Sequence, residues 1–210
     1  MSAVRTSPAS ERTKKTNATT SVKVIGMDPS FRNWGYAVAE VDIETLEVTV
    51  SEVEVFTTEK TSARTVRRTS DDFRCAQELY GKFLEMVHRH EPAFLFSEIP
   101  AGSQSAVASK GLGIALGVLA SSAVPLIQVQ PQEVKLALTN SKTASKQQMM
   151  EEAHKLHPNA AGWLYRIKNN TPLLLSRMEH AADAIGAIHA GIQTQQFQDY
   201  LMVLRGMLRR

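Results

Sequence analysis

Residues 22–35, VKVIGMDPSFRNWG, have the pattern of a buried β-strand that ends in a carboxylate and then turns. The β-branched residues before Asp28 favour a strand, and the Pro, Ser, Asn and Gly residues after it favour a turn. The pattern therefore places an acid at the end of a strand. Asp-Pro-Ser is also an ordinary turn initiator, so this acid alone does not indicate a functional site.

Length and composition favour one globular domain. The chain has 210 residues, of which 43% are hydrophobic, enough for a single core. We expect a disordered basic tail at 1–20, a folded domain at 21–195 and a C-terminal helical extension at 196–210. The single Cys75 excludes an internal disulfide framework, and no stretch is apolar enough for a membrane span. A cytoplasmic protein is expected.

The charge is unevenly distributed. The net charge is +3, and the first twenty residues carry all of it, so the remainder sums to zero. Any site for nucleic acid on the folded domain must therefore be a local patch of basic residues.

The first half of the chain predicts a β-meander followed by a helix. Strands at 34–41 and 46–56 complete the meander. The polar segment 57–70 contains Arg67 and Arg68, and it is either a solvated loop or a basic arm that faces DNA. Apolar residues then recur at helical spacing from an Asp71 cap to about residue 90.

A second acid, Glu98, ends the apolar run 93–99, which is typical of a strand covered on both faces. A carboxylate in that position is costly unless it is paired, exposed or bound to metal. A helix of small residues at 106–123, a strand at 125–130 and helices at 131–138 and 145–157 follow. The loop 158–172 mixes aromatic and basic residues, which either stack bases and hold phosphates or pack onto the core.

The third acid, Asp183, lies in a predicted helix at 177–194. His180 shares its helix face, and Glu179 is within reach of it at a spacing of four. The surrounding Ala and Gly residues would let this helix approach the sheet closely. A final amphipathic helix is predicted at 196–210.

The order of these elements resembles the ribonuclease H-like fold, an α/β fold with a mixed five-stranded sheet flanked by helices. The closer resemblance is to RuvC-type Holliday junction resolvases, and it covers most of the chain. It is carried by GMDPSFRNWGYAV, FSEI, PQEVKLALTNSKTASKQQM and EHAADAIGAI. The chain resembles a divergent branch of that family, such as a phage-encoded one acting in a bacterial or phage-infected host cell.

The resemblance implies a catalytic centre and a DNA surface. Metal ligands at the centre would be Asp28, Glu98, His180 and Asp183, and the helix period leaves open whether Glu179 or His180 faces the metal. Lys146 matches the catalytic basic residue near the scissile phosphate. The resemblance also implies a DNA contact at Lys135. Lys142, which clusters with Lys135 and Lys146, and Arg67 and Arg68 of the polar segment are further candidate DNA contacts.

Carboxylate ligands suit Mg²⁺, for which Mn²⁺ would substitute, and two such ions promote phosphodiester hydrolysis. The resemblance also implies an enzyme that nicks four-way DNA junctions symmetrically. Because symmetric cleavage of two strands needs two active sites, a homodimer is expected, with the helix at 106–123 contributing to the interface. The alternatives are a broader flap or fork endonuclease and a noncatalytic junction-binding module. An actin-type ATPase is disfavoured because the Gly/Thr-rich phosphate loop is missing after Asp28.

Two departures from the family stand out. The aromatic residue expected soon after Glu98 is replaced by Ile99-Pro100-Ala101, so any base insertion would have to come from another segment. The 158–172 segment is longer than expected for the compact bacterial enzymes, which indicates altered junction or sequence preference.

Overall fold

The computed structural model describes residues 21–99, 102 and 105–208. The predicted basic tail at 1–20 and the Pro100-Ala101 position lie outside the described residues. None of the helices in these described ranges has both the length and the apolar content needed to cross a membrane.

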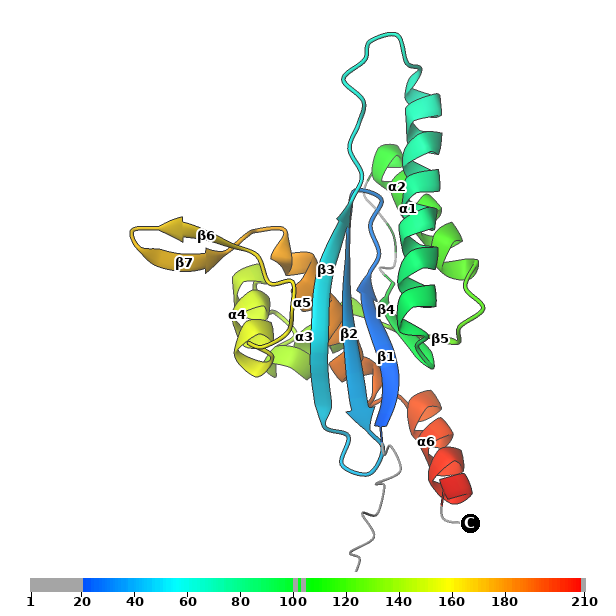
Figure 1. Ribbon diagram of the computed structural model, residues 1–210, viewed down its shortest axis with the longest axis vertical. Helices are drawn as coiled ribbons and strands as arrows, with labels where there is room; N and C mark the ends of the chain where they lie inside the picture. Colours follow the sequence, from blue (N-terminus) through cyan, green and yellow to red (C-terminus); the bar gives the residue numbers. More distant parts are fainter. Residues whose placement is uncertain (1–20, 100–101, 103–104, 209–210) are drawn as a thin grey trace, which may run out of the picture.

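A mixed five-stranded sheet forms the centre of the molecule, as predicted (Figure 1). Its strand order is β3-β2-β1-β4-β5, in which β1, β2 and β3 form the antiparallel meander and β4 and β5 run parallel to β1. The strands are β1 (Ser21–Asp28), β2 (Asn33–Asp42), β3 (Val48–Thr57), β4 (Phe94–Glu98) and β5 (Leu126–Val129).

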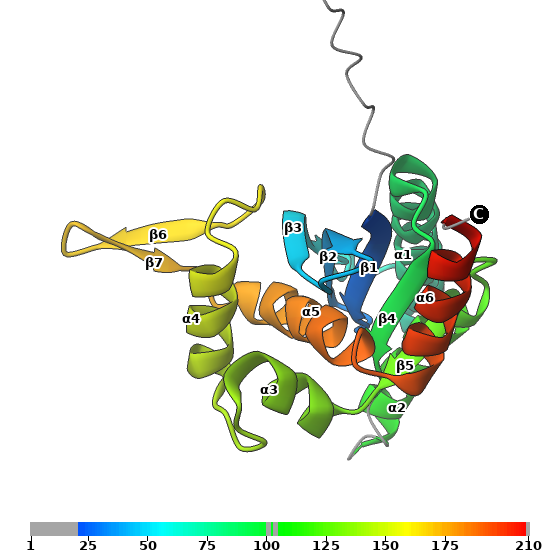
Figure 2. The ribbon, with the colours of Figure 1, turned by 90° about the horizontal axis from the view of Figure 1, so that it is seen from below.

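Helices cover both faces of the sheet (Figures 1 and 2). On one face, α1 and α2 close a core around Trp34 and Phe83. On the other face, α5 lies across the strands, and α3, α4 and α6 pack around the same core. The helices are α1 (Arg68–His90), α2 (Ala106–Ala120), α3 (Pro131–Thr139), α4 (Lys146–Leu156), α5 (Met178–Gly191) and α6 (Gln195–Leu208).

Two predicted elements need correction. Helix α1 begins at Arg68, so Asp71 is not its cap but lies buried in its first turn. The Asp71 carboxylate accepts a hydrogen bond from the Thr61 backbone N–H at 3.1 Å, which ties the preceding loop to the helix. The predicted loop 158–172 contains most of a β-hairpin, β6 (Tyr165–Lys168) and β7 (Thr171–Leu174).

Candidate active site

The two strand-end acids lie on the same face of the sheet, at neighbouring strand ends. Side chains alternate between faces along a strand, so Asp28 shares the face of Val24, and Glu98 shares the face of Phe96 in the same core cluster. β1 and β4 pair in parallel up to Met27 and Ser97. Asp28 and Glu98 each follow one residue of the last pair, so their carboxylates lie next to each other at the carboxyl ends of β1 and β4.

Two glycines allow helix α5 to reach that edge. A Cβ atom on Gly26 would stand 2.0 Å from the backbone oxygen of Ala184, and one on Gly35 would stand 2.0 Å from that of His180. Gly35 pairs with Asp28 in the sheet. Because these two positions carry no side chain, the first two turns of α5 lie directly on β1 and β2, as the small residues of the helix predict.

His180 is the residue of α5 that contacts a strand-end acid. Its Nδ1 lies 2.6 Å from Asp28 Oδ2, so Nδ1 donates the proton of this hydrogen bond. Burial alone would lower the pKa of His180, but the hydrogen bond and the charges of Asp28, Glu179 and Asp183 raise it overall. His180 therefore faces the acids, and its Nε2 lies 3.8 Å from a Glu179 oxygen.

The site concentrates negative charge in a partly buried position. Burial, followed by the charges of Asp28 and Asp183, raises the pKa of Glu98 to about 8. Burial and the charge of Asp28 likewise raise the pKa of Asp183 to about 7. Lys135 opposes the shift at Glu98. A cluster of carboxylates that disfavour one another's ionisation requires added positive charge to be fully ionised at neutral pH.

The side chains at this site are of the type that binds a hard divalent cation. Within the described residues, no three His, Cys, Asp or Glu side chains stand close enough together to hold an ion. The oxygen donors of Asp28, Glu98 and Asp183 are nevertheless the type that Mg²⁺ prefers. Their role as metal ligands remains a prediction.

A lysine approaches the site from α4. Lys146 Nζ lies 2.7 Å from Glu179 Oε1, and this hydrogen bond raises the pKa of Lys146. The Lys146 side chain is 75% exposed, so the ion pair contributes little to stability. It can therefore be exchanged for a contact with an incoming anion. Glu179, which the sequence left as the alternative to His180, is instead the partner of Lys146.

No protein-family model matches the chain. The crossover junction endodeoxyribonuclease RuvC of an Anaeromyxobacter species is 30% identical over 136 residues, which cover 63% of this chain and 61% of that protein. The RuvC of Anaeromyxobacter dehalogenans is 32% identical over 147 residues, 66% of this chain and 71% of that protein. The chain belongs to the RuvC family.

Solved structures agree with this assignment at the level of the fold. The complex of Thermus thermophilus RuvC with a Holliday junction substrate aligns with a TM-score of 0.59 at 21% identity, over 80% of this chain and 92% of that one. The yeast mitochondrial Holliday junction resolvase Ydc2 aligns with a TM-score of 0.52 at 16% identity, over 87% and 84% of the two chains. The predicted ribonuclease H-like fold is thus confirmed. A phage origin remains a prediction.

The predicted DNA contacts of this RuvC-family chain divide into two groups. Lys135 and Lys146 belong to the carboxylate site, through their electrostatic effect on Glu98 and the pairing with Glu179, respectively. Lys142 is exposed on the loop between α3 and α4, and Arg67 and Arg68 are exposed where α1 begins. No described contact joins the second group to the carboxylates, so their contact with DNA remains a prediction.

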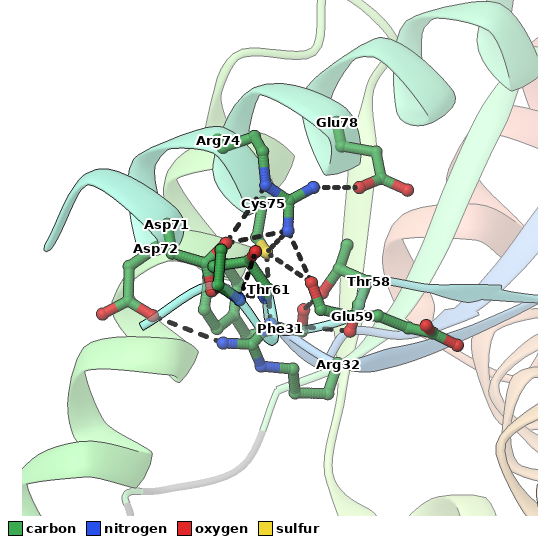
Figure 3. A network of polar contacts seen from close by, with 11 residues as sticks. Phe31, Arg32, Thr58, Glu59, Thr61, Asp71, Asp72, Arg74, Cys75 and Glu78 are labelled. Atoms are coloured by element: carbon green, nitrogen blue, oxygen red, sulfur yellow. Dashed lines mark hydrogen bonds and ion pairs between the residues drawn. The ribbon is translucent and has the colours of Figure 1, made fainter. Parts of the chain in front are cut away.

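A polar network missed by the sequence analysis holds the turn after Asp28 against α1 (Figure 3). Arg32 reaches Asp72 at 3.3 Å and Cys75 Sγ at 3.2 Å, and Asp72 also pairs with Lys110 of α2. The Thr58 hydroxyl donates to the Phe31 carbonyl at 2.6 Å. A hollow of about 730 Å³ opens beside this network, and its lining includes the cations Arg32, Lys60, Arg68 and Lys110.

The network positions the backbone that follows Asp28. Its only sequence signals are the adjacent acids Asp71 and Asp72 in a predicted helix. Both are buried, and buried carboxylates require ionic or hydrogen-bonding partners. Asp71 pairs with Arg74, three residues later in the same helix, whereas Arg32 and Lys110, the partners of Asp72, are distant in sequence. Spacing along the chain could therefore identify only the first of these partners.

Proposed function

We propose that this chain is a metal-dependent endonuclease that resolves four-way DNA junctions. The observation that carries the proposal is the contact of His180 with Asp28 next to the strand end of Glu98, in a RuvC-family chain whose Asp28 charge also acts on Glu98 and Asp183. The printed name of its relatives, crossover junction endodeoxyribonuclease, and the Holliday junction bound to Thermus thermophilus RuvC support the choice of substrate.

In this proposal, Asp28 is the central ligand, because it lies between β4 and α5 and its charge acts on both Glu98 and Asp183. Glu98 and Asp183 would each hold one Mg²⁺ ion, or Mn²⁺ in its place. Two such ions, when bound, neutralise charge on the phosphodiester and activate the attacking water. The raised pKa values of Glu98 and Asp183 support this assignment, since cations would restore full ionisation of both groups.

In the same proposal, His180 would assist the metal or the attacking water, and two lysines would offset the negative charge of the phosphate. His180 donates its Nδ1 proton to Asp28. Its Nε2, which lies 3.8 Å from a Glu179 oxygen, would after deprotonation bind the second ion or orient the attacking water. Lys146 would leave its exposed pair with Glu179 and contact the scissile phosphate. Lys135, which opposes the shift at Glu98, would add positive charge on the other side.

Symmetric resolution requires two active sites, and we infer a homodimer. The predicted interface helix supports this, since α2 buries only four of its fifteen residues against its own chain. Val107 of this helix, at 59% exposure, would be available to a second copy.

The proposal is tested by nicking of end-labelled DNA. Wild type and Asp28→Asn are incubated with four-way junction, flap and linear duplex, each with Mg²⁺, with Mn²⁺ and with EDTA. We expect paired symmetric nicks in the junction alone, dependent on metal and reduced at least ~100-fold in Asp28→Asn, because loss of the carboxylate proposed as the central ligand would remove electrostatic stabilisation of that order. Binding of the junction should survive the substitution.

Other outcomes would assign a different function. Equal cutting of flaps and junctions would indicate a broader branched-DNA endonuclease. Tight junction binding without nicking under any metal would contradict the enzymatic proposal and leave a noncatalytic binding module.

A further inference from the structure

The β6–β7 hairpin is a regular element that the catalytic proposal does not use. Its strands pair from Tyr165 with Leu174 to Lys168 with Thr171. Asn169 and Asn170 join them with φ angles of 50° and 59°. Positive φ at both central residues matches the type I′ turn, whose twist suits a two-residue hairpin. The hairpin projects from the body beyond α4 in both views (Figures 1 and 2).

The root of the hairpin is fixed to the folded domain. Leu175 N–H donates to the Leu164 carbonyl at 2.8 Å, which closes its base. Tyr165 Oη lies 2.6 Å from His154 Nε2 of α4. The segment before it is fastened to the sheet edge, where Ala161 pairs with β3 and Gly162 approaches Val53 so closely that a Cβ would clash with its carbonyl. A projecting element with so firm a root holds its side chains in a defined position.

The hairpin carries positive charges that form no ion pair with the described acids. From residue 153 to residue 178 the sequence contains no Asp or Glu, whereas it contains Lys155, Arg166, Lys168 and Arg177. Both cations of β6, Arg166 and Lys168, are exposed. They sit two apart on a strand and therefore share a face. Neither forms an ion pair with any acid in the described ranges of the chain.

The hairpin is connected to the carboxylate site through the starts of α4 and α5. The lining of a hollow of about 510 Å³ between the hairpin and α4 includes Ser176 and Gln147, which follows Lys146 in the chain. Ser176 lies four residues before His180 and seven before Asp183. The start of α4 and the start of α5 therefore support both the proposed reacting centre and the root of the hairpin.

We propose that the β6–β7 hairpin is a duplex-binding arm, which holds the phosphate backbone of a DNA arm beside the cleavage site through Arg166 and Lys168. The inference rests on the proposed function for its substrate class. Unpaired cations on a rigid, acid-free projection match the sequence-independent phosphate contacts that position proteins on DNA. The arm contributes binding and orientation, not chemistry.

The test measures how junction affinity depends on salt, in EDTA, where no metal-dependent cleavage occurs. Fluorescence anisotropy with a labelled four-way junction compares wild type with Arg166→Gln/Lys168→Gln. A charge-matched control, Lys23→Gln/Arg89→Gln, removes two exposed cations at the far ends of β1 and α1. We expect the hairpin variant to show a log affinity versus log salt slope shallower by about 2, at roughly 0.9 per lost phosphate contact.

Further variants distinguish the outcomes. Arg166→Lys/Lys168→Arg should keep the wild-type slope, and shortening the junction arms should remove the difference between hairpin variant and wild type. Equal slopes for the hairpin variant and wild type, or an equal loss in the control, would overturn the proposal. So would a hairpin variant that binds DNA normally but changes its oligomeric state, since the arm would then be a protein contact. Failure of wild type to nick junctions would overturn the catalytic proposal and leave this binding result intact.

Discussion

The carboxyl group of Glu98 couples the proposed metal site to stability. Burial and the neighbouring acids raise its pKa from an ordinary value of 4.5 to about 8. Between these values the folded protein binds more protons than the unfolded chain does. The free energy of unfolding of the metal-free protein should therefore fall as the pH rises from 4.5 to about 8. Mg²⁺ should reverse this loss most strongly at the upper end, where its ligands are deprotonated most readily.

Melting temperatures measured across this range in EDTA and in Mg²⁺ check the prediction. Glu98→Gln removes the titrating group, so we expect a flatter pH dependence in EDTA and a smaller increase on adding Mg²⁺. Glu85→Gln, on an exposed position of α1, serves as the matched control and should follow wild type. A Glu98→Gln profile parallel to that of wild type would contradict the assignment.

The sequence patterns predicted the strand-end acids of the site but not which residue of α5 contacts them. Asp28 and Glu98 could be predicted because each ends an apolar strand, and strand periodicity then puts both on one face. The choice between His180 and Glu179 could not be made, since a helical period allows either to point inward. The choice depends on how close α5 lies to β2, and that approach is set by Gly35, 145 residues earlier in the chain.

At the scale of elements, the contact of α5 with the sheet determines the geometry of the site. Gly35→Ala would place a Cβ 2.0 Å from the His180 carbonyl oxygen, so the helix must move away from the strand that pairs with Asp28. We expect a loss of about 1–3 kcal/mol in the free energy of unfolding, the usual cost of overpacking. Nicking should fall further than stability alone explains, because His180 is drawn away from Asp28.

Chemical denaturation and nicking rates measured at a temperature where the variant is folded test this. Gly81→Ala is the control, since a Cβ there meets no atom within 4 Å. In a helix interior it should stabilise by about 0.5–1 kcal/mol. If Gly35→Ala kept full stability and full nicking, close approach of α5 would not be required.

The elements that the sequence missed lack a buried face. β6 is exposed at all four positions, so its four-residue alternation of apolar and cationic side chains is not a signal of burial, and its Asn-Asn pair was the other local signal of a hairpin. The start of α1 was predicted too late in the chain. Asp is a common N-cap residue, but Asp71 lies inside the helix and accepts a hydrogen bond from Thr61 of the preceding loop. Apolar patterns predicted the five strands of the central sheet and most of α1, whereas α2 was predicted from its small residues, α3 from Pro131 and α4 from the Ser145 cap.

At the scale of the whole molecule, the two sheet faces have different environments. The α5 face carries the carboxylates, whereas α1 and α2 cover the opposite face. Apolar side chains are exposed on both faces, on α6 as well as on α1 and α2. Phe73, Tyr80 and Leu84 of α1 are 65%, 43% and 42% exposed, and Val107 of α2 is 59% exposed. Spacings of seven and four residues put the three α1 side chains on one helix face. An apolar stripe of this kind is typical of a protein interface.

We therefore expect this α1 stripe to lie in the homodimer interface, together with α2. Tyr80→Glu/Leu84→Glu would bury two charges in that interface, so wild type should sediment as a dimer and the variant as a monomer. Since symmetric resolution requires two sites, the variant should give single, unpaired nicks at a reduced rate. Met202→Glu, at a 68% exposed position of α6, is the control. Dissociation by Met202→Glu instead would move the interface to α6, and a wild-type monomer that still makes paired nicks would contradict the dimer.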